Sequence, residues 1–113
     1  MKIIRNNIIP FPGYKAINLF GILFVRKDAQ IDDVTLNHEA IHTAQMKEML
    51  YVFFYLWYLV EWIVRLIKYK NANEAYLNIC FEREAYIYEE ELDYLETRKP
   101  FAFLGFINYT PEE

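Results

Sequence analysis

Residues 38 to 42 read His-Glu-Ala-Ile-His, and these residue types at this spacing suit metal chemistry. On a helix, residues four positions apart lie one turn apart on the same face. His38 and His42 can therefore present two imidazole nitrogens to one tetrahedral Zn²⁺ ion. Glu39 lies between them and can take a proton from the water that the metal activates, whose pKa falls to about 7. The spacing predicts a zinc site with Glu39 as its general base.

Two further features of the sequence favour a metal over a pair of ordinary surface or core histidines. His38 and His42 are the only histidines of the chain, and both fall within this motif. The motif also follows Asp32 and Asp33, which are good residues for capping the start of a helix. We therefore expect the two histidines on one helix, close to its amino-terminal end.

A catalytic zinc site needs a third protein ligand and an open fourth position. Cys80 is the only cysteine, which excludes an internal disulfide or a thiolate zinc cluster, and its apolar neighbours indicate a small buried residue. A carboxylate is therefore expected as the third ligand. Residues 81 to 86, Phe-Glu-Arg-Glu-Ala-Tyr, offer two candidates, Glu82 and Glu84.

With this second motif the chain resembles the gluzincin class of metallopeptidases, in which HExxH is followed on a later helix by Glu-x-x-Ala-Asp or Glu-x-x-Ala-Asn. The resemblance extends over residues 18 to 92 in layout and is specific at the two motifs. It implies that Glu82 is the third ligand and that Ala85 lets the two active-site helices approach closely. Tyr86 stands where the family has Asp or Asn. A phenol there can support a ligand imidazole by a hydrogen bond, or it can stabilise an oxyanion.

The hydrophobic pattern favours Glu84 instead of Glu82. The apolar stripe of the expected helix consists of Leu77, Phe81, Tyr88, Leu92 and Leu95. Glu84 lies nearer the centre of this stripe, where a carboxylate needs a partner such as a metal or an arginine. We favour Glu82 because the spacing to Ala85 matches the family, and keep Glu84 as the alternative.

The composition indicates one globular domain over residues 1–113, with 55% hydrophobic and 19% aromatic residues. A net charge of −4 and the lack of a Lys/Arg cluster argue against nucleic-acid binding. The amino-terminal segment has no uninterrupted apolar stretch typical of a signal peptide, so we expect a cytoplasmic protein.

The expected fold is α+β and mainly helical, with zincin-like active-site helices and a short β-hairpin or edge strand near the amino terminus. Residues 1 to 17 contain Pro10, Pro12 and Gly13 and are expected to be irregular and extended. Residues 18 to 26 are apolar and predict a strand, which a short hairpin can join to the preceding segment. Leu19, Gly21 and Leu23 of that strand are the residues expected to hold a substrate peptide by main-chain pairing.

Three helices are expected after this strand: one from Val34 to Met49, a second ending near Lys70, and a third from the capping sequence Asn71-Ala72-Asn73 to about Arg98, before Pro100. Residues 49 to 60 form an uncharged apolar run that is short for a membrane span. We favour a core or oligomer helix there. A helix at the membrane surface, and a true span, are the alternatives.

The sequence therefore predicts a minimal zinc-dependent metallopeptidase that acts on a peptide or protein substrate. Two other hypotheses stay open. The first is a non-catalytic zinc module that binds a partner, is associated with a membrane, or forms a homo-oligomer through residues 49–60. The second is a helical interaction domain without a metal.

Overall fold

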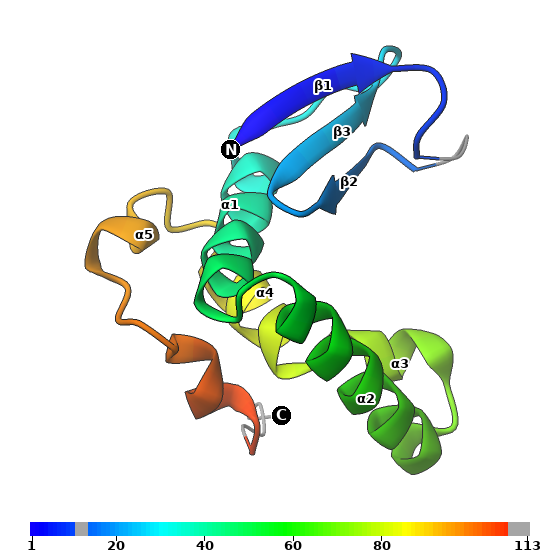
Figure 1. The fold of residues 1–113 in the computed structure, drawn as a ribbon, viewed down its shortest axis with the longest axis vertical. Helices are drawn as coiled ribbons and strands as arrows, with labels where there is room; N and C mark the ends of the chain where they lie inside the picture. Colours follow the sequence, from blue (N-terminus) through cyan, green and yellow to red (C-terminus); the bar gives the residue numbers. More distant parts are fainter. Residues whose placement is uncertain (11–13, 109–113) are drawn as a thin grey trace.

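The computed structural model describes residues 1–10 and 14–108 and confirms an α+β, mainly helical fold. Figure 1 shows a small sheet at one end of α1, while α2 leaves the other end of α1 at a steep angle. In chain order the elements are β1 (Lys2–Asn6), β2 (Ala16–Leu19), β3 (Ile22–Arg26), α1 (Asp33–Glu48), α2 (Val52–Tyr69), α3 (Ala72–Leu77), α4 (Cys80–Tyr88), α5 (Tyr94–Thr97) and the 3₁₀ helix η1 (Ala102–Phe106).

The sheet has the strand order β1-β3-β2, with β1 parallel and β2 antiparallel to β3. The predicted single strand over 18–26 is wrong, because Phe20 and Gly21 both have positive φ and form a hairpin turn. The predicted irregular start is also wrong over Lys2–Asn6, which forms β1. Its pairing with β3 is a long-range contact that the local sequence pattern does not reveal. Residues 11–13 of that start lie outside the described residues.

Helix α1 begins as predicted, because the Asp32 carboxylate accepts a hydrogen bond of 2.8 Å from the main-chain N–H of Thr35. It ends at Glu48, and the chain then turns sharply through Leu50 and Tyr51, which both have positive φ. The axes of α1 and α2 differ in direction by 110° across this corner. The two helices are therefore separate, and α2 returns an aromatic face towards α1.

The predicted continuous helix from 71 to 98 is wrong, because the chain forms three shorter helices there. Asn71 caps α3 as expected, accepting a hydrogen bond from the Glu74 N–H. Helix α4 starts anew because the Glu61 carboxylate accepts a hydrogen bond of 2.9 Å from the Cys80 N–H. At its carboxyl-terminal end, the side-chain amide of Asn37 donates hydrogen bonds to main-chain carbonyl groups that have no partner within the helix. These carbonyls belong to Tyr88, Glu89 and Glu91.

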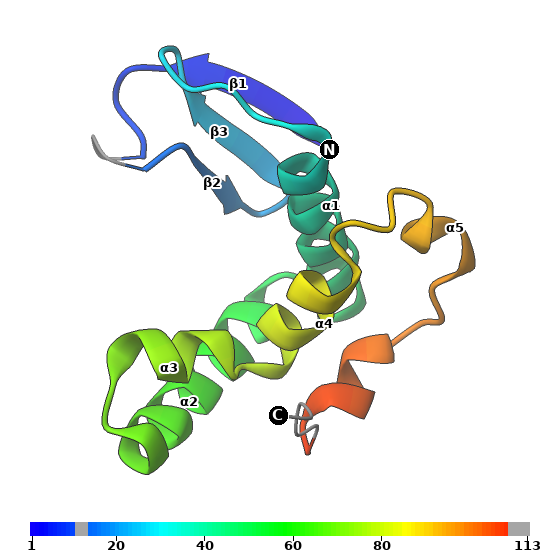
Figure 2. The same cartoon turned by 180° about the vertical axis from the view of Figure 1, so that it is seen from behind.

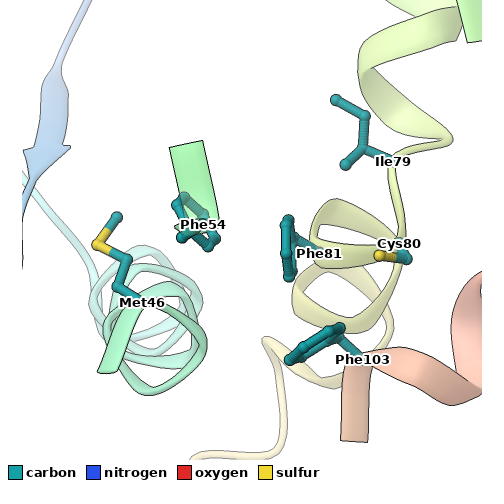
Figure 3. Packing of buried hydrophobic residues seen from close by; sticks show 6 residues of the cluster. All are labelled: Met46, Phe54, Ile79, Cys80, Phe81 and Phe103. Atoms are coloured by element: carbon teal, nitrogen blue, oxygen red, sulfur yellow. The ribbon is translucent and has the colours of Figure 1, made fainter. Parts of the chain in front are cut away.

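Figure 2 shows α4 lying against α1 and α3 lying beside α2. The core between these helices is aromatic: the ring of Phe81 is 4.5 Å from that of Phe54 and 4.7 Å from that of Phe103 (Figure 3). Met46, Ile79 and Cys80 complete this cluster. Cys80 is buried as predicted. This core fixes α4 against α1 and α2, the helices that surround the predicted site.

Helix α2 is only partly a core helix. Among its residues Phe54 is buried, whereas eight apolar side chains on its other side are exposed. Taken singly, no helix in residues 1–10 and 14–108 has the length and apolar character to cross a membrane. Helices α1 and α2 together meet that criterion of length and composition, but with the sharp bend between them.

We predict that Phe81→Ala lowers the free energy of unfolding by about 3–5 kcal/mol, because the ring is fully buried and leaves a cavity. Phe53→Ala is the matched control, since the ring of Phe53 is 55% exposed, and it should change stability by less than about 0.5 kcal/mol. Urea unfolding followed by circular dichroism measures both. Equal losses in the two variants would contradict the assignment of the core.

Candidate metal centre

The crossing of α1 and α4 brings three predicted ligands together. His38 and His42 come from α1, and Glu82 comes from the first turn of α4. The three residues are 8%, 6% and 4% exposed, respectively, and one ligand atom from each lies within 4.8 Å of the others. A group of two imidazoles and one carboxylate buried in this way can hold a metal ion.

The distances between the candidate ligand atoms fit a small tetrahedral ion. Bonds of about 2.0–2.1 Å to Zn²⁺ place neighbouring ligand atoms about 3.3–3.4 Å apart. The Nε2 atoms of His38 and His42 lie 3.1 Å apart. The Oε1 atom of Glu82 lies 3.3 Å from the Nε2 of His38 and 3.0 Å from that of His42. A slight expansion of this triangle makes it one face of the tetrahedron.

The outer nitrogen of each imidazole has an acceptor that fixes the tautomer. The Nδ1 atom of His38 lies 2.8 Å from the carboxylate of Glu89, which can only accept. The Nδ1 atom of His42 lies 2.8 Å from the Oε1 of Gln45, whose own amide nitrogen donates to Glu84. Both Nδ1 atoms therefore carry the proton, and both Nε2 atoms face the shared point as metal ligands must.

The carboxylate of Glu82 is held from its other side by α2. The Tyr58 hydroxyl donates a hydrogen bond of 2.6 Å to Oε2, which leaves Oε1 for the histidines. Burial alone would raise the pKa of Glu82, but the charge on His42 and these hydrogen bonds hold it well below its usual range. Burial would likewise lower the pKa of His42, but the Glu82 carboxylate raises it to about 9. The site stabilises an anionic ligand and favours a cation beside it.

Glu39 faces the same space as the three ligands. A cavity of about 240 Å³ is lined by His38, Glu39, His42 and Glu82 together with residues of β2 and α2. Burial raises the pKa of Glu39, and the neighbouring imidazoles oppose this only in part. A carboxylate whose pKa is raised towards neutrality is a better proton acceptor at physiological pH. The cavity has room for water and for part of a ligand.

The structure separates the two candidate carboxylates. Glu84 is fully buried, but it forms an ion pair with Arg98 and accepts hydrogen bonds from Tyr94 and Gln45. Arg98 also pairs with Glu48 at 2.9 Å. The hydrophobic pattern therefore pointed to Glu84, a carboxylate whose partner is an arginine. The group that can hold a metal contains Glu82 instead.

Tyr86 lies beside the metal ligands without bonding to them. Its ring packs edge-on against the ring of His38, with 4.5 Å between centroids, and its hydroxyl is 3.0 Å from that of Tyr76. Glu89 instead occupies the position that supports the His38 imidazole. Tyr76 lines the cavity, as do Tyr55 and Tyr58.

The predicted peptide-binding residues are distributed over the hairpin. Leu19 belongs to β2, the edge strand, and Gly21 lies in the turn. Leu23 is fully buried in the central strand β3, so its main chain is paired on both sides. Of the two edge strands, β1 and β2, it is β2 whose residues Ala16 and Asn18 line the metal-site cavity.

Three supporting residues escaped the sequence analysis, namely Gln45, Tyr58 and Glu89. Gln45 lies three positions after His42, so helical spacing alone could have identified it. Glu89 follows Glu82 by seven positions, two turns further along. Tyr58 carries no such indication, because the sharp corner between α1 and α2 decides where it points.

Comparison of this chain with protein-family models, with curated proteins and with solved structures finds no match. The interpretation of the metal centre therefore rests on its own residues. These are two imidazoles of fixed tautomer, one buried carboxylate and a second carboxylate facing the same cavity.

We predict that Glu82→Gln and Glu84→Gln have different effects. Glu82→Gln removes the anionic ligand and should abolish the binding of one equivalent of zinc, measured by calorimetry and metal analysis. Glu84→Gln leaves Arg98 with less compensation and should lower the free energy of unfolding by about 3 kcal/mol, with a smaller loss of zinc affinity. The reverse ranking of zinc affinities would make Glu84 the ligand.

We also predict that Glu89 orients the His38 imidazole and that the Tyr86 hydroxyl does not. Glu89→Gln weakens the acceptor of the Nδ1 proton and should reduce zinc affinity about 10–100-fold. Tyr86→Phe keeps the ring contact and removes only the hydroxyl, so zinc affinity should change by less than about threefold. Competition with a chelating dye measures both variants. A larger loss of zinc affinity in Tyr86→Phe than in Glu89→Gln would show that the Tyr86 hydroxyl orients the His38 imidazole.

Proposed function

We propose that this chain is a zinc-dependent metallopeptidase of the gluzincin type. The observation that supports this best is the position of Glu39, which faces the same cavity as His38, His42 and Glu82. A zinc ion bound by these three ligands supplies a Lewis acid that activates water at neutral pH and polarises a carbonyl group. The family resemblance of the HExxH and Glu-x-x-Ala motifs agrees with this assignment.

Glu39 is the proposed general base. Its carboxylate takes a proton from the attacking water and later passes it to the leaving amine. Its raised pKa suits both steps, because an acceptor with a very low pKa would release the proton too early. Among the phenols that line the cavity, Tyr58 donates to Glu82 and Tyr55 donates to the carbonyl of Asn18. Tyr76, whose hydroxyl is bonded only to that of Tyr86 among the described residues, is the proposed donor of a hydrogen bond to the developing oxyanion.

The free edge of β2 is the proposed site for an extended peptide. The main-chain N–H of Arg26 donates to the carbonyl of Lys15, so the alternation of an antiparallel pair turns Ala16 and Asn18 away from β3. Their main-chain groups face the free edge beside the metal ligands. A substrate strand added there would place one of its carbonyl groups in the cavity. The side-chain amide of Asn18 donates to the main-chain oxygen of Glu39 and so couples the strand to α1.

A second cavity of about 520 Å³ continues along β2 from the metal-site cavity. Both cavities are lined by Ala16, Ile17, Tyr58 and Tyr76. Its other lining residues are Ile9, Pro10, Tyr14 and Leu19. This mainly apolar lining suits a large apolar side chain of the substrate.

We predict that Glu39→Gln retains one equivalent of zinc and loses about 10²–10⁴-fold in the rate of peptide cleavage. Glutamine keeps the shape of the side chain but cannot accept the proton. A library of quenched fluorescent peptides with apolar residues around the scissile bond provides the assay. Asp33→Asn, at the exposed start of the same helix, is the control and should keep full activity.

Two outcomes would instead favour a non-catalytic zinc module. One is a crystal structure of the zinc-loaded protein in which a fourth protein side chain closes the coordination sphere. The other is that the zinc-loaded wild type cleaves no peptide of the library. In either case the metal would join α1 to α4 and take no part in chemistry.

A further inference from the structure

The side of α2 that faces away from the protein is apolar along its whole length. Eight exposed side chains recur at helical spacing on this side, and Ile67 alone is 72% exposed. They are Val52, Phe53, Leu56, Leu59, Val60, Ile63, Val64 and Ile67. We call this set the outer face of α2. It is about 22 Å long at 1.5 Å per residue. Ordinary surfaces expose apolar residues singly, whereas here they form one continuous strip.

The charged pair and the indole N–H groups of α2 point the opposite way. Glu61 and Arg65 pair with each other at 3.2 Å, and their side chains are only 10% and 14% exposed. Glu61 also accepts from the indole N–H of Trp57, and the indole N–H of Trp62 donates to the carbonyl of Ala72. Apart from Lys68 in its last turn, the helix has thus turned its charged and indole groups inward and its aliphatic groups outward.

The composition of the outer face suits hydrocarbon better than another protein. Interfaces between proteins are enriched in Tyr, Trp, Phe, Met and Arg, and Leu and Val are under-represented among their energetically dominant residues. Phe53 is the single enriched residue of the outer face, and the other seven are Val, Leu and Ile. Its Trp and Tyr neighbours face the protein instead.

The exposed charged side chains of the segment that contains the outer face are positive. Between residues 47 and 70 the exposed charged side chains are those of Lys47, Lys68 and Lys70, in a chain with a net charge of −4. Glu48, in the same stretch, is paired with Arg98. Lysines bordering an apolar surface are complementary to the headgroups of anionic lipids.

We propose that the outer face of α2 binds the surface of an anionic lipid bilayer, with the helix axis parallel to the membrane plane. The apolar side chains enter the boundary between headgroups and acyl chains, and Lys47, Lys68 and Lys70 contact the anionic headgroups. The paired Glu61 and Arg65 remain on the protein side, so no charge has to enter the hydrocarbon. This proposal does not depend on the metal or on peptidase activity.

Flotation with lipid vesicles tests the proposal on the full chain. Wild type should float with vesicles of phosphatidylcholine and phosphatidylglycerol, and more weakly with phosphatidylcholine alone. The triple variant Leu56→Gln, Val60→Gln, Ile63→Gln should lose at least about tenfold in vesicle affinity. A control triple variant changes exposed apolar residues elsewhere, Ile8→Gln, Leu92→Gln and Leu95→Gln, and should bind as wild type does.

A second variant tests the charges. Lys68→Gln with Lys70→Gln should lower affinity for the anionic vesicles by about fivefold for each lysine and leave the weak binding to phosphatidylcholine unchanged. Circular dichroism and thermal unfolding show whether each variant is folded. Failure of the folded wild type to float with either vesicle would overturn the proposal. So would a concentration-dependent dimer in analytical ultracentrifugation that the α2 triple variant abolishes, since a second copy would then cover the outer face.

Discussion

The structure depends on one electrostatic constraint: the carboxylate of Glu82 is buried between two imidazoles. A buried anion is tolerated only where hydrogen bonds and positive charge compensate it. His38 and His42 supply this compensation from α1, and Tyr58 supplies it from α2. Three helices must therefore meet at one carboxylate. The aromatic core beside it packs the same helices together, so the apolar and the polar requirements favour the same arrangement.

The two histidines of the group that can hold a metal could be predicted from the sequence because local spacing encodes them. The two histidines lie one helical turn apart, and Asp32 identifies where their helix starts. The choice between Glu82 and Glu84 was harder, since both are buried. Hydrophobic pattern indicates that a carboxylate is buried but not which partner it meets, and Arg98 lies fourteen residues further along the chain.

The elements that local patterns misjudged are those governed by distant side chains. The stretch from 71 to 98 has the composition of one helix, yet Glu61 caps a new start at Cys80 and Asn37 satisfies the carbonyls at its end. Strand β1 is similar, because only its pairing with β3 makes it a strand. In each case a contact across the fold overrides a reasonable local preference.

The hydrogen bonds from His42 to Gln45, Glu84 and finally Arg98 have a consequence for synthesis on the ribosome. The HExxH helix emerges from the ribosome early. The positive charge that compensates Glu84 belongs to Arg98, which is synthesised 50 positions after its second partner, Glu48. Until Arg98 has been synthesised, the polar layer beneath His42 cannot close over an ionised Glu84 without leaving a buried anion uncompensated. We therefore expect the group of residues that can hold a metal to be completed late, after α5 has been translated, and the HExxH motif alone not to be a competent binding unit.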